Sequence, residues 1–270
     1  KCCAGEFPYT QYYIECDPEA DYSRVTRPRA LPLLTPFETS RGKKWYWTTF
    51  SGDQVDLNYH CPYVLRDIME VLFTYACRGA RFIRLDAIGF VWKRPGTTCM
   101  HLAETHALIQ LMRLMLTEIF PGTGIITETN VPHKENISYF GRGDEAHMVY
   151  QFPLPPLVLH TMLAGNTDRL TAWAEGLSAD PVPEGSTFFN FLASHDGIGV
   201  RPVEDILTEA QLQALLCAVT DRGGRVSYKK NADGSESPYE LNINFLDAIS
   251  DPGEPDETRA ARFLASQAIM

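Results

Sequence analysis

Two spacings of apolar residues alternate along the middle of the chain. Between Pro62 and Arg78, apolar residues recur every three or four positions, which predicts an amphipathic helix that ends before Gly79. The same spacing predicts further helices over residues 104–119, 157–164 and 168–177. Short apolar runs, typical of buried strands, lie among these helices at residues 81–87, 124–129, 148–152 and 187–193.

Helices and strands that alternate with short connections are typical of a parallel sheet covered by helices. Within the strand at 81–87, successive side chains point to opposite faces, so Arg84 and Asp86 share one face and Ile83 and Leu85 share the other. In a barrel, one face of each strand meets the helices and the other meets the axis. We therefore expect Ile83 and Leu85 to pack beneath the helices, and Arg84 and Asp86 to point toward the axis.

The two ends of the chain show weaker periodicity. Residues 1–60 are rich in proline and aromatic residues and predict loops and short extended pieces. After residue 200 the pattern loosens, and the turn-rich segment 228–244 predicts a surface excursion. The last residues, 257–270, predict one more helix.

Composition excludes several classes of protein. The chain has 34 acidic and 24 basic residues, and its net charge of −10 argues against a nucleic-acid partner, which requires a basic face. No apolar run reaches the roughly 18 residues that would span a membrane. The seven cysteines show no zinc-ligand spacing, so we expect reduced structural thiols and a cytoplasmic location. The pattern indicates no oligomeric state.

Charged side chains follow three of the predicted strands at the same edge. Asp86 ends the first strand, Glu128 ends "GIITET", and His195 and Asp196 follow the last strand. In parallel barrels the active site lies at the carboxyl ends of the strands, so we expect these side chains to converge on one pocket. Three carboxylates beside an arginine and a histidine suit retaining glycoside chemistry, in which the two reacting carboxyl groups lie roughly 5–6 Å apart.

Two other interpretations of these residues remain open at this point. The strand at 81–87, taken alone, is also consistent with a structural ion pair between Arg84 and Asp86. A carboxylate metal site is the second alternative. The positive charge of Arg84 argues against a cation beside Asp86.

Several segments resemble, in order, the signature motifs of glycoside hydrolase family 13, the alpha-amylase family. They are "QVDLN" (54–58), "RLDAIGF" (84–90), "ITETN" (126–130) and "FLASHD" (191–196). Three further segments, "SHDGIGV", "YQFPLPPLVLH" and "SPYELNIN", resemble the sucrose phosphorylase subfamily more narrowly. The segment "ITETNVPHKENISYFG" resembles its glucosylglycerate phosphorylase and sucrose 6'-phosphate phosphorylase members more than plain sucrose phosphorylases.

The resemblance implies a role for each matching residue. Asp86 would be the nucleophile, Glu128 the general acid/base, and Asp196 a stabiliser of the transition state through sugar hydroxyls. Arg84 would orient Asp86, and His195 would hold the glucosyl ring. Other residues are implied to contact the sugar, the acceptor or phosphate: Gln54, Asn130, His133 and Tyr239. Without the resemblance, His133 is equally well explained as part of a solvated loop, and Tyr239 is better explained as part of a plain surface turn.

The resemblance also implies an α/β fold, a partial (β/α)8 barrel with about strands 4 to 7. Residues 1–60 would be the remainder of an inserted small domain, and residues 61–200 the central part of the barrel. Residues 201–256 would form an insertion between strands 7 and 8, and residues 257–270 the start of the helix before strand 8. Because the pattern contains about four strands where the family has eight, we expect an internal fragment of a longer enzyme.

The function that the resemblance implies is that of a retaining glycoside phosphorylase. It would transfer glucose from an alpha-glucoside (glucosylglycerate, sucrose 6'-phosphate or sucrose) to inorganic phosphate and give alpha-glucose 1-phosphate. Phosphate would be a co-substrate, and no cofactor or metal is expected. Two alternatives remain: an alpha-glucosidase or transglucosidase of the same family, and a non-catalytic homologue or inert fragment.

Overall fold

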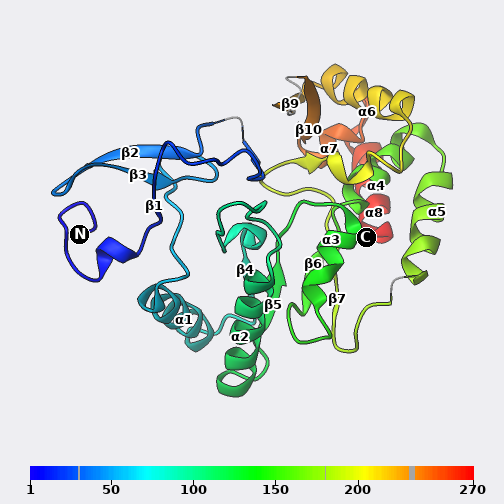
Figure 1. Ribbon diagram of the computed structural model, residues 1–270. Helices are drawn as coiled ribbons and strands as arrows, with labels where there is room; N and C mark the ends of the chain where they lie inside the picture. Colours follow the sequence, from blue (N-terminus) through cyan, green and yellow to red (C-terminus); the bar gives the residue numbers. More distant parts are fainter. Residues whose placement is uncertain (30, 180, 231–234) are drawn as a thin grey trace. The chain divides into compact units, whose positions relative to one another are not determined.

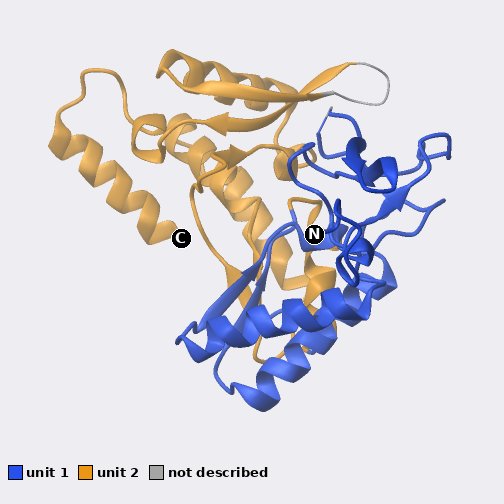
Figure 2. Cartoon of the chain, turned by 90° about the vertical axis from the view of Figure 1, so that its left-hand side faces the viewer, with its two compact units in different colours: residues 1–129, 144–147 blue, residues 130–143, 148–270 orange. Residues whose placement is uncertain are grey.

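The computed structural model describes the whole chain except residues 30, 180 and 231–234. The chain divides into two compact units, which Figure 2 distinguishes by colour. Unit 1 comprises residues 1–129 and 144–147, and unit 2 comprises residues 130–143 and 148–270. Each unit has its own secondary structure and its own candidate functional residues.

Unit 1 begins with a small antiparallel sheet. A short 3-10 helix, η1 (Tyr9–Gln11), precedes strands β1 (Glu15–Cys16), β2 (Leu34–Thr39) and β3 (Gly42–Trp47). The strand order is β1-β3-β2, and β2 and β3 form a hairpin. The segment predicted as loops and short extended pieces is therefore partly a sheet. Its small core contains Trp47, which is 1% exposed, packed with Val25, Leu33 and Cys99.

The rest of unit 1 alternates helices and parallel strands. In chain order these are α1 (Pro62–Cys77), β4 (Phe82–Leu85), η2 (Ile88–Phe90), α2 (Ala103–Ile119) and β5 (Gly124–Thr127). Figure 1 shows α2 alongside β5. The two helices and two strands match the predicted positions, but both strands are shorter. Beyond β4 the backbone turns away at Ala87, whose φ of 45° is left-handed.

The faces of β4 agree with the alternation in the sequence. Ile83 and Leu85 are buried, at 6% and 9% exposure, while Phe82 on the opposite face is 53% exposed. β4 and β5 are parallel, with Ile83 opposite Ile125. The predicted burial of Ile83 and Leu85 on one face of β4 is confirmed, whereas the direction of the other face toward a barrel axis stays a prediction.

Residues 144–147 are held against α2 and β5 by buried polar contacts. Glu145 is 3% exposed, and its carboxylate oxygens lie 2.8 Å from His106 Nδ1 and 3.3 Å from Gln110 Nε2. Arg113 donates a hydrogen bond to the Glu145 carbonyl oxygen. His147 accepts a hydrogen bond at Nδ1 from the Ile125 amide, at 2.9 Å. Because Nδ1 accepts this bond, the His147 ring must be neutral in the folded state.

We expect unit 1 to lose stability between about pH 6.5 and pH 4 because of His147. Burial, and then the nearby Arg113, lower the pKa of His147 from 6.5 to about 4. Above pH 6.5 the ring is neutral in both states, so its stabilisation is complete; as pH falls, the unfolded state takes up a proton first and unfolding is favoured. The loss should be roughly 1–2 kcal/mol, below the full linkage value because the ring is partly exposed.

The measurement is the free energy of unfolding by urea as a function of pH. His147→Asn is the matched variant, because its side-chain oxygen can accept from the Ile125 amide but does not titrate in this range. An acid slope that is equally steep in wild type and variant would show that His147 does not cause it.

Unit 2 contains a second parallel pair of strands. Its first elements are α3 (His133–Ile137), η3 (Ser138–Phe140), β6 (Met148–Tyr150), α4 (Leu154–Ala164), α5 (Asp168–Gly176), η4 (Leu177–Ala179) and β7 (Thr187–Phe189). β6 and β7 are parallel, with Tyr150 opposite Phe189. The Tyr150 ring packs against three phenylalanine rings, those of Phe152, Phe189 and Phe191. The predicted strands and helices of this segment are present, with shorter strands.

The second half of unit 2 corrects one prediction. It comprises β8 (Ile198–Gly199), η5 (Arg201–Val203), α6 (Glu209–Asp221), β9 (Arg225–Lys230), β10 (Glu236–Asn242), α7 (Phe245–Ala248) and α8 (Asp256–Ile269). The segment 228–244, predicted as a turn-rich surface excursion, is more ordered than expected: it supplies β10 and part of β9 to an antiparallel sheet of order β8-β10-β9. Residues 231–234 of that segment lie outside the described residues.

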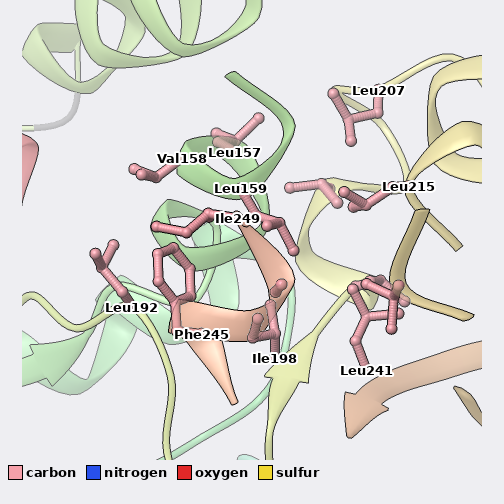
Figure 3. Close-up of a cluster of buried hydrophobic side chains, with 14 of the residues drawn as sticks. Leu157, Val158, Leu159, Leu192, Ile198, Leu207, Leu215, Leu241, Phe245 and Ile249 are labelled. Carbon is pink, nitrogen blue, oxygen red and sulfur yellow. The ribbon is translucent and has the colours of Figure 1, made fainter. Parts of the chain in front are cut away.

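This sheet is anchored in a buried core. Figure 3 shows Leu157, Val158 and Leu159 of α4 with Ile198 of β8 and Leu241 of β10 in one apolar cluster. The sequence prediction missed the pairing of β9 with β10, although the described part of 228–244 lies largely at the surface and only Leu241 in it is buried. Within the described residues, no helix has the length and apolar character needed to cross a membrane.

Candidate active site

The register of β4 and β5 places two carboxylates side by side in unit 1. Leu85 lies opposite Thr127 at the carboxyl ends of the two parallel strands. The Glu128 amide donates to the Leu85 carbonyl oxygen at 3.1 Å, so the pairing continues one residue beyond β5. Asp86 and Glu128 therefore both follow directly from paired strand ends, as the sequence predicts for one rim.

Arg84 lies between these two carboxylates. Its Nη1 donates a hydrogen bond to Asp86 Oδ1, and its Nη2 lies 3.9 Å from Glu128 Oε2. Glu128 Oε2 also accepts a hydrogen bond from the Ala87 amide at 2.9 Å. The left-handed turn at Ala87 directs this amide back toward the end of β5. Arg84 and the Ala87 amide thus hold both carboxylates in one cluster.

The two carboxylates differ in their exposure. The Asp86 side chain is 73% exposed, whereas that of Glu128 is 16% exposed. An exposed carboxylate held by an arginine is available to attack a ligand. A partly buried carboxyl group with a backbone donor on one oxygen is placed to exchange a proton through the other. This division suits a nucleophile and a general acid/base.

Unit 2 presents the third predicted carboxylate on a tight turn. After β7 the chain forms a bridge between Ser194 and Gly197, with backbone hydrogen bonds of 3.2 and 3.0 Å in the two directions. His195 Nε2 lies 3.2 Å from Asp196 Oδ2, and both side chains are more than half exposed. The structure thus brings His195 and Asp196 together at one turn.

The remaining predicted residues lie at separate places within their units. Gln54 is exposed, and its Oε1 accepts a hydrogen bond from Ser51 Oγ at 3.3 Å. Asn130 has a buried Oδ1 without a hydrogen-bond partner among the described residues, and its side chain lies against Gly199 of β8. The His133 ring lies 6.0 Å from that of Phe188. The Tyr239 carbonyl oxygen, at a bulge in β10, accepts from the Val200 amide.

A buried ion pair in unit 1 was not predicted from the sequence. Lys93 is 4% exposed, and its Nζ lies 2.8 Å from Asp56 Oδ2. Asp56 also accepts from the amide and the hydroxyl of Thr49, each at 2.7 Å. Burial lowers the pKa of Lys93, and the Asp56 carboxylate opposes that effect. The pair ties the "QVDLN" segment to the loop that follows Asp86; a lysine in the apolar run "GFVWK" was the available signal.

Replacing Lys93 with Met should lower the free energy of unfolding by about 3–5 kcal/mol, because it leaves the Asp56 carboxylate, only 16% exposed, without its cation. The measurement is urea unfolding of the whole protein. Lys43→Met is the control: Lys43 is exposed above the Trp45 ring at 5.4 Å, and its loss should cost less than about 0.5 kcal/mol. Equal effects of the two substitutions would contradict the role of the Lys93–Asp56 pair.

Among the described residues, no three His, Cys, Asp or Glu side chains are grouped in a way that would hold a metal ion. The cluster of unit 1 instead combines two carboxylates with a guanidinium group. In such a set the negative carboxylates can stabilise, and one of them can attack, a carbon that becomes cationic. Glycoside cleavage requires this.

Comparison with known proteins agrees with this chemistry. The family model described as the catalytic domain of alpha-amylase matches residues 2–198. The chain is 52% identical to the glucosylglycerate phosphorylase of Escherichia coli (strain K12) over 97% of the chain and 47% of that relative. The glucosylglycerate phosphorylase of Allomeiothermus silvanus gives the same values. A trehalose synthase of Thermus thermophilus is 32% identical over 77% of the chain and 22% of that protein.

Solved structures show the fold. The sucrose 6F-phosphate phosphorylase of Thermoanaerobacter thermosaccharolyticum superposes with a TM-score of 0.80 at 21% identity, over 98% of this chain and 53% of that one. The alpha-amylase of H. orenii gives a TM-score of 0.58 at 18% identity, over 81% and 42%. The fold is thus the predicted α/β class, a partial (β/α)8 barrel. The chain spans about half the length of the curated relatives that it matches.

Proposed function

Because the chain belongs to the alpha-amylase family of glycoside hydrolases, we propose that the whole protein is a retaining glycoside phosphorylase that acts on an alpha-glucoside, with glucosylglycerate as the first candidate. It would transfer the glucosyl group to inorganic phosphate. The relatives with 52% identity over almost the whole chain carry the substrate part of the proposal. The clustered carboxylates of unit 1 carry the reaction type.

The observation that carries the mechanism is the placement of Asp86 and Glu128 at paired strand ends with Arg84 between them. Asp86 attacks the anomeric carbon, and the bond from that carbon to the leaving oxygen breaks while Glu128 gives the oxygen its proton. A phosphate oxygen then attacks the same carbon, Asp86 leaves, and Glu128 takes the proton from phosphate. Two inversions give alpha-glucose 1-phosphate with net retention.

Two parts of this mechanism stay predictions. A retaining pair requires the two reacting carboxyl groups to lie about 5–5.5 Å apart, and a crystal structure with a bound glucoside would measure that distance. The roles of His195 and Asp196 rest on the resemblance of "FLASHD" to the family motif. So do the contacts proposed for Gln54, Asn130, His133 and Tyr239.

Two cations of unit 2 support an anionic co-substrate. Lys229 lies opposite Ser237 in the β9–β10 pair, and Arg201 follows β8 on the other side of β10. Arg201 is close enough to lower the pKa of Lys229 further, after the larger effect of burial. Glu204 also lies near Lys229 and opposes the effect of Arg201 on its pKa. Phosphate or the carboxylate of glycerate has the charge to occupy such a site.

The test is product analysis with the purified whole protein. Glucosylglycerate, sucrose 6'-phosphate and sucrose are each incubated with and without inorganic phosphate, and glucose 1-phosphate and free glucose are measured. We expect glucose 1-phosphate to form only with phosphate and fastest from glucosylglycerate. Release of free glucose at the same rate with and without phosphate would identify a hydrolase, which is the alternative within this family. The absence of any product in every mixture would contradict both activities.

A cytoplasmic location and the absence of any cofactor are parts of the same proposal. All seven cysteines are free, which supports a reducing compartment. The chemistry proposed for Asp86 and Glu128 proceeds with protein carboxylates and phosphate alone. Phosphorolysis that survives exhaustive dialysis against a chelator would agree with the proposal that no metal cofactor is needed.

A further inference from the structure

Strand β10 lies directly against the turn that presents His195 and Asp196. Gly197 has a φ of 91°, and a side chain at this position would collide with the Leu241 carbonyl oxygen. Leu241 pairs with Ile198 in the β8–β10 ladder. The position of the turn therefore depends on where β10 is held.

Asn242, the last residue of β10, contacts the turn through its side chain. Asn242 Nδ2 donates a hydrogen bond to the Asp196 carbonyl oxygen at 3.3 Å. Its Oδ1 accepts a hydrogen bond from Ser227 Oγ of β9 at 2.6 Å. The bond from Ser227 leaves the Asn242 amide group oriented with its NH₂ toward Asp196. Ser227, Asn242 and the Asp196 backbone thus form one hydrogen-bonded chain.

This chain lies on the side of the sheet that faces away from the core. Side chains alternate along β10, so Asn242 and its neighbour Leu241 point to opposite faces. Leu241 is fully buried in the apolar cluster of unit 2 together with Val226 of β9. The buried face fixes the hairpin to the body of unit 2, and the opposite face fixes the turn to the hairpin.

We propose that Asn242 is a positioning residue, which, with Ser227, holds the turn of Asp196 so that its carboxylate acts in both half-reactions. This inference rests on the proposed function. Asn242 bonds the backbone of Asp196 rather than its carboxylate, so it acts through Asp196 and not on the glucosyl group directly. A turn released from β10 leaves the carboxylate misplaced, and a displacement of about 1 Å can cost on the order of a hundredfold in rate.

Asn242→Asp is the decisive variant. It keeps an oxygen to accept from Ser227 but replaces the NH₂ donor with an oxygen that faces the Asp196 carbonyl. We expect Asn242→Asp and Asn242→Ala each to lower kcat by about 10- to 100-fold, with the KM values for glucoside and phosphate changed by less than about threefold. Ser227→Ala should give a smaller loss, and Ser227→Thr, which retains the hydroxyl, should restore most of it.

The double variant tests whether the two residues act in one chain. If Ser227 acts by orienting Asn242, adding Ser227→Ala to Asn242→Ala should not lower kcat further. Asn244→Ala is the matched control two residues away. Asn244 caps α7 by accepting from the Leu246 amide at 2.9 Å, so its loss should lower the melting temperature and leave kcat within about twofold.

The outcomes separate this inference from the proposed function. An inactive wild-type protein would defeat the proposed function. If the wild type is active and Asn242→Asp leaves kcat unchanged, with or without a change in melting temperature, Asn242 has a purely structural role. A rise in KM for phosphate or glucoside at constant kcat would instead mean that Asn242 contacts a substrate, and would overturn the positioning role.

Discussion

Asp86→Asn in the whole protein should abolish phosphorolysis, with a loss of kcat on the order of 10⁴-fold or more. The amide has nearly the shape of the carboxylate but cannot form an ester with the anomeric carbon. The Asp86 side chain is 73% exposed, so its replacement should not unfold the protein. The measurement is glucose 1-phosphate release from glucosylglycerate and phosphate, together with the melting temperature.

The control for Asp86→Asn is Asp256→Asn. Asp256 begins α8, its side chain is 98% exposed, and it lies 3.6 Å from Arg259. The substitution removes the same charge from the surface and should leave kcat within about twofold. If Asp86→Asn retained activity near that of wild type, the nucleophile would have to be another residue and the proposed mechanism would fail.

Residues 1–270 expressed alone should show no measurable phosphorolysis and should self-associate. In unit 1, β4 is the edge strand of its sheet within the described residues. Phe82 on its exposed face and Tyr75 of α1 are 53% and 51% exposed, and they line a pocket of about 350 Å³ with Arg84. Open strand edges beside exposed apolar side chains favour association. Other large apolar side chains of α1 and α2 are also exposed: Val71, Leu114 and Ile119.

The measurements are size-exclusion chromatography and the glucose 1-phosphate assay on the expressed chain. Phe82→Ser should shift the chain toward the monomer if the β4 face drives association, whereas Leu264→Ser, which changes the 67% exposed Leu264 of α8, should have less effect. A monomeric chain that melts cooperatively and is active would contradict the prediction.

The sequence alone determined the elements that depend on local periodicity. Helices α1 and α2 and the four parallel strands lie where the apolar spacing predicted them, because each element buries one face that recurs at its own period. It also determined the rim residues of unit 1. A charged residue that directly follows a buried strand must lie at the strand's carboxyl end, so Asp86 and Glu128 could be assigned before any contact was known.

Only the tertiary structure decided which distant segments meet. Lys93 and Asp56 are separated along the chain, and neither residue's neighbours show that the two are buried against each other. The β9–β10 hairpin was obscured by its polar turn, and its pairing follows from burial of Leu241 in a core built largely by α4 and α6. The bond from Asn242 to Asp196 depends on that pairing. Periodicity reports which face of an element is apolar, but the partner of a buried charge or of a strand edge is chosen by packing in three dimensions.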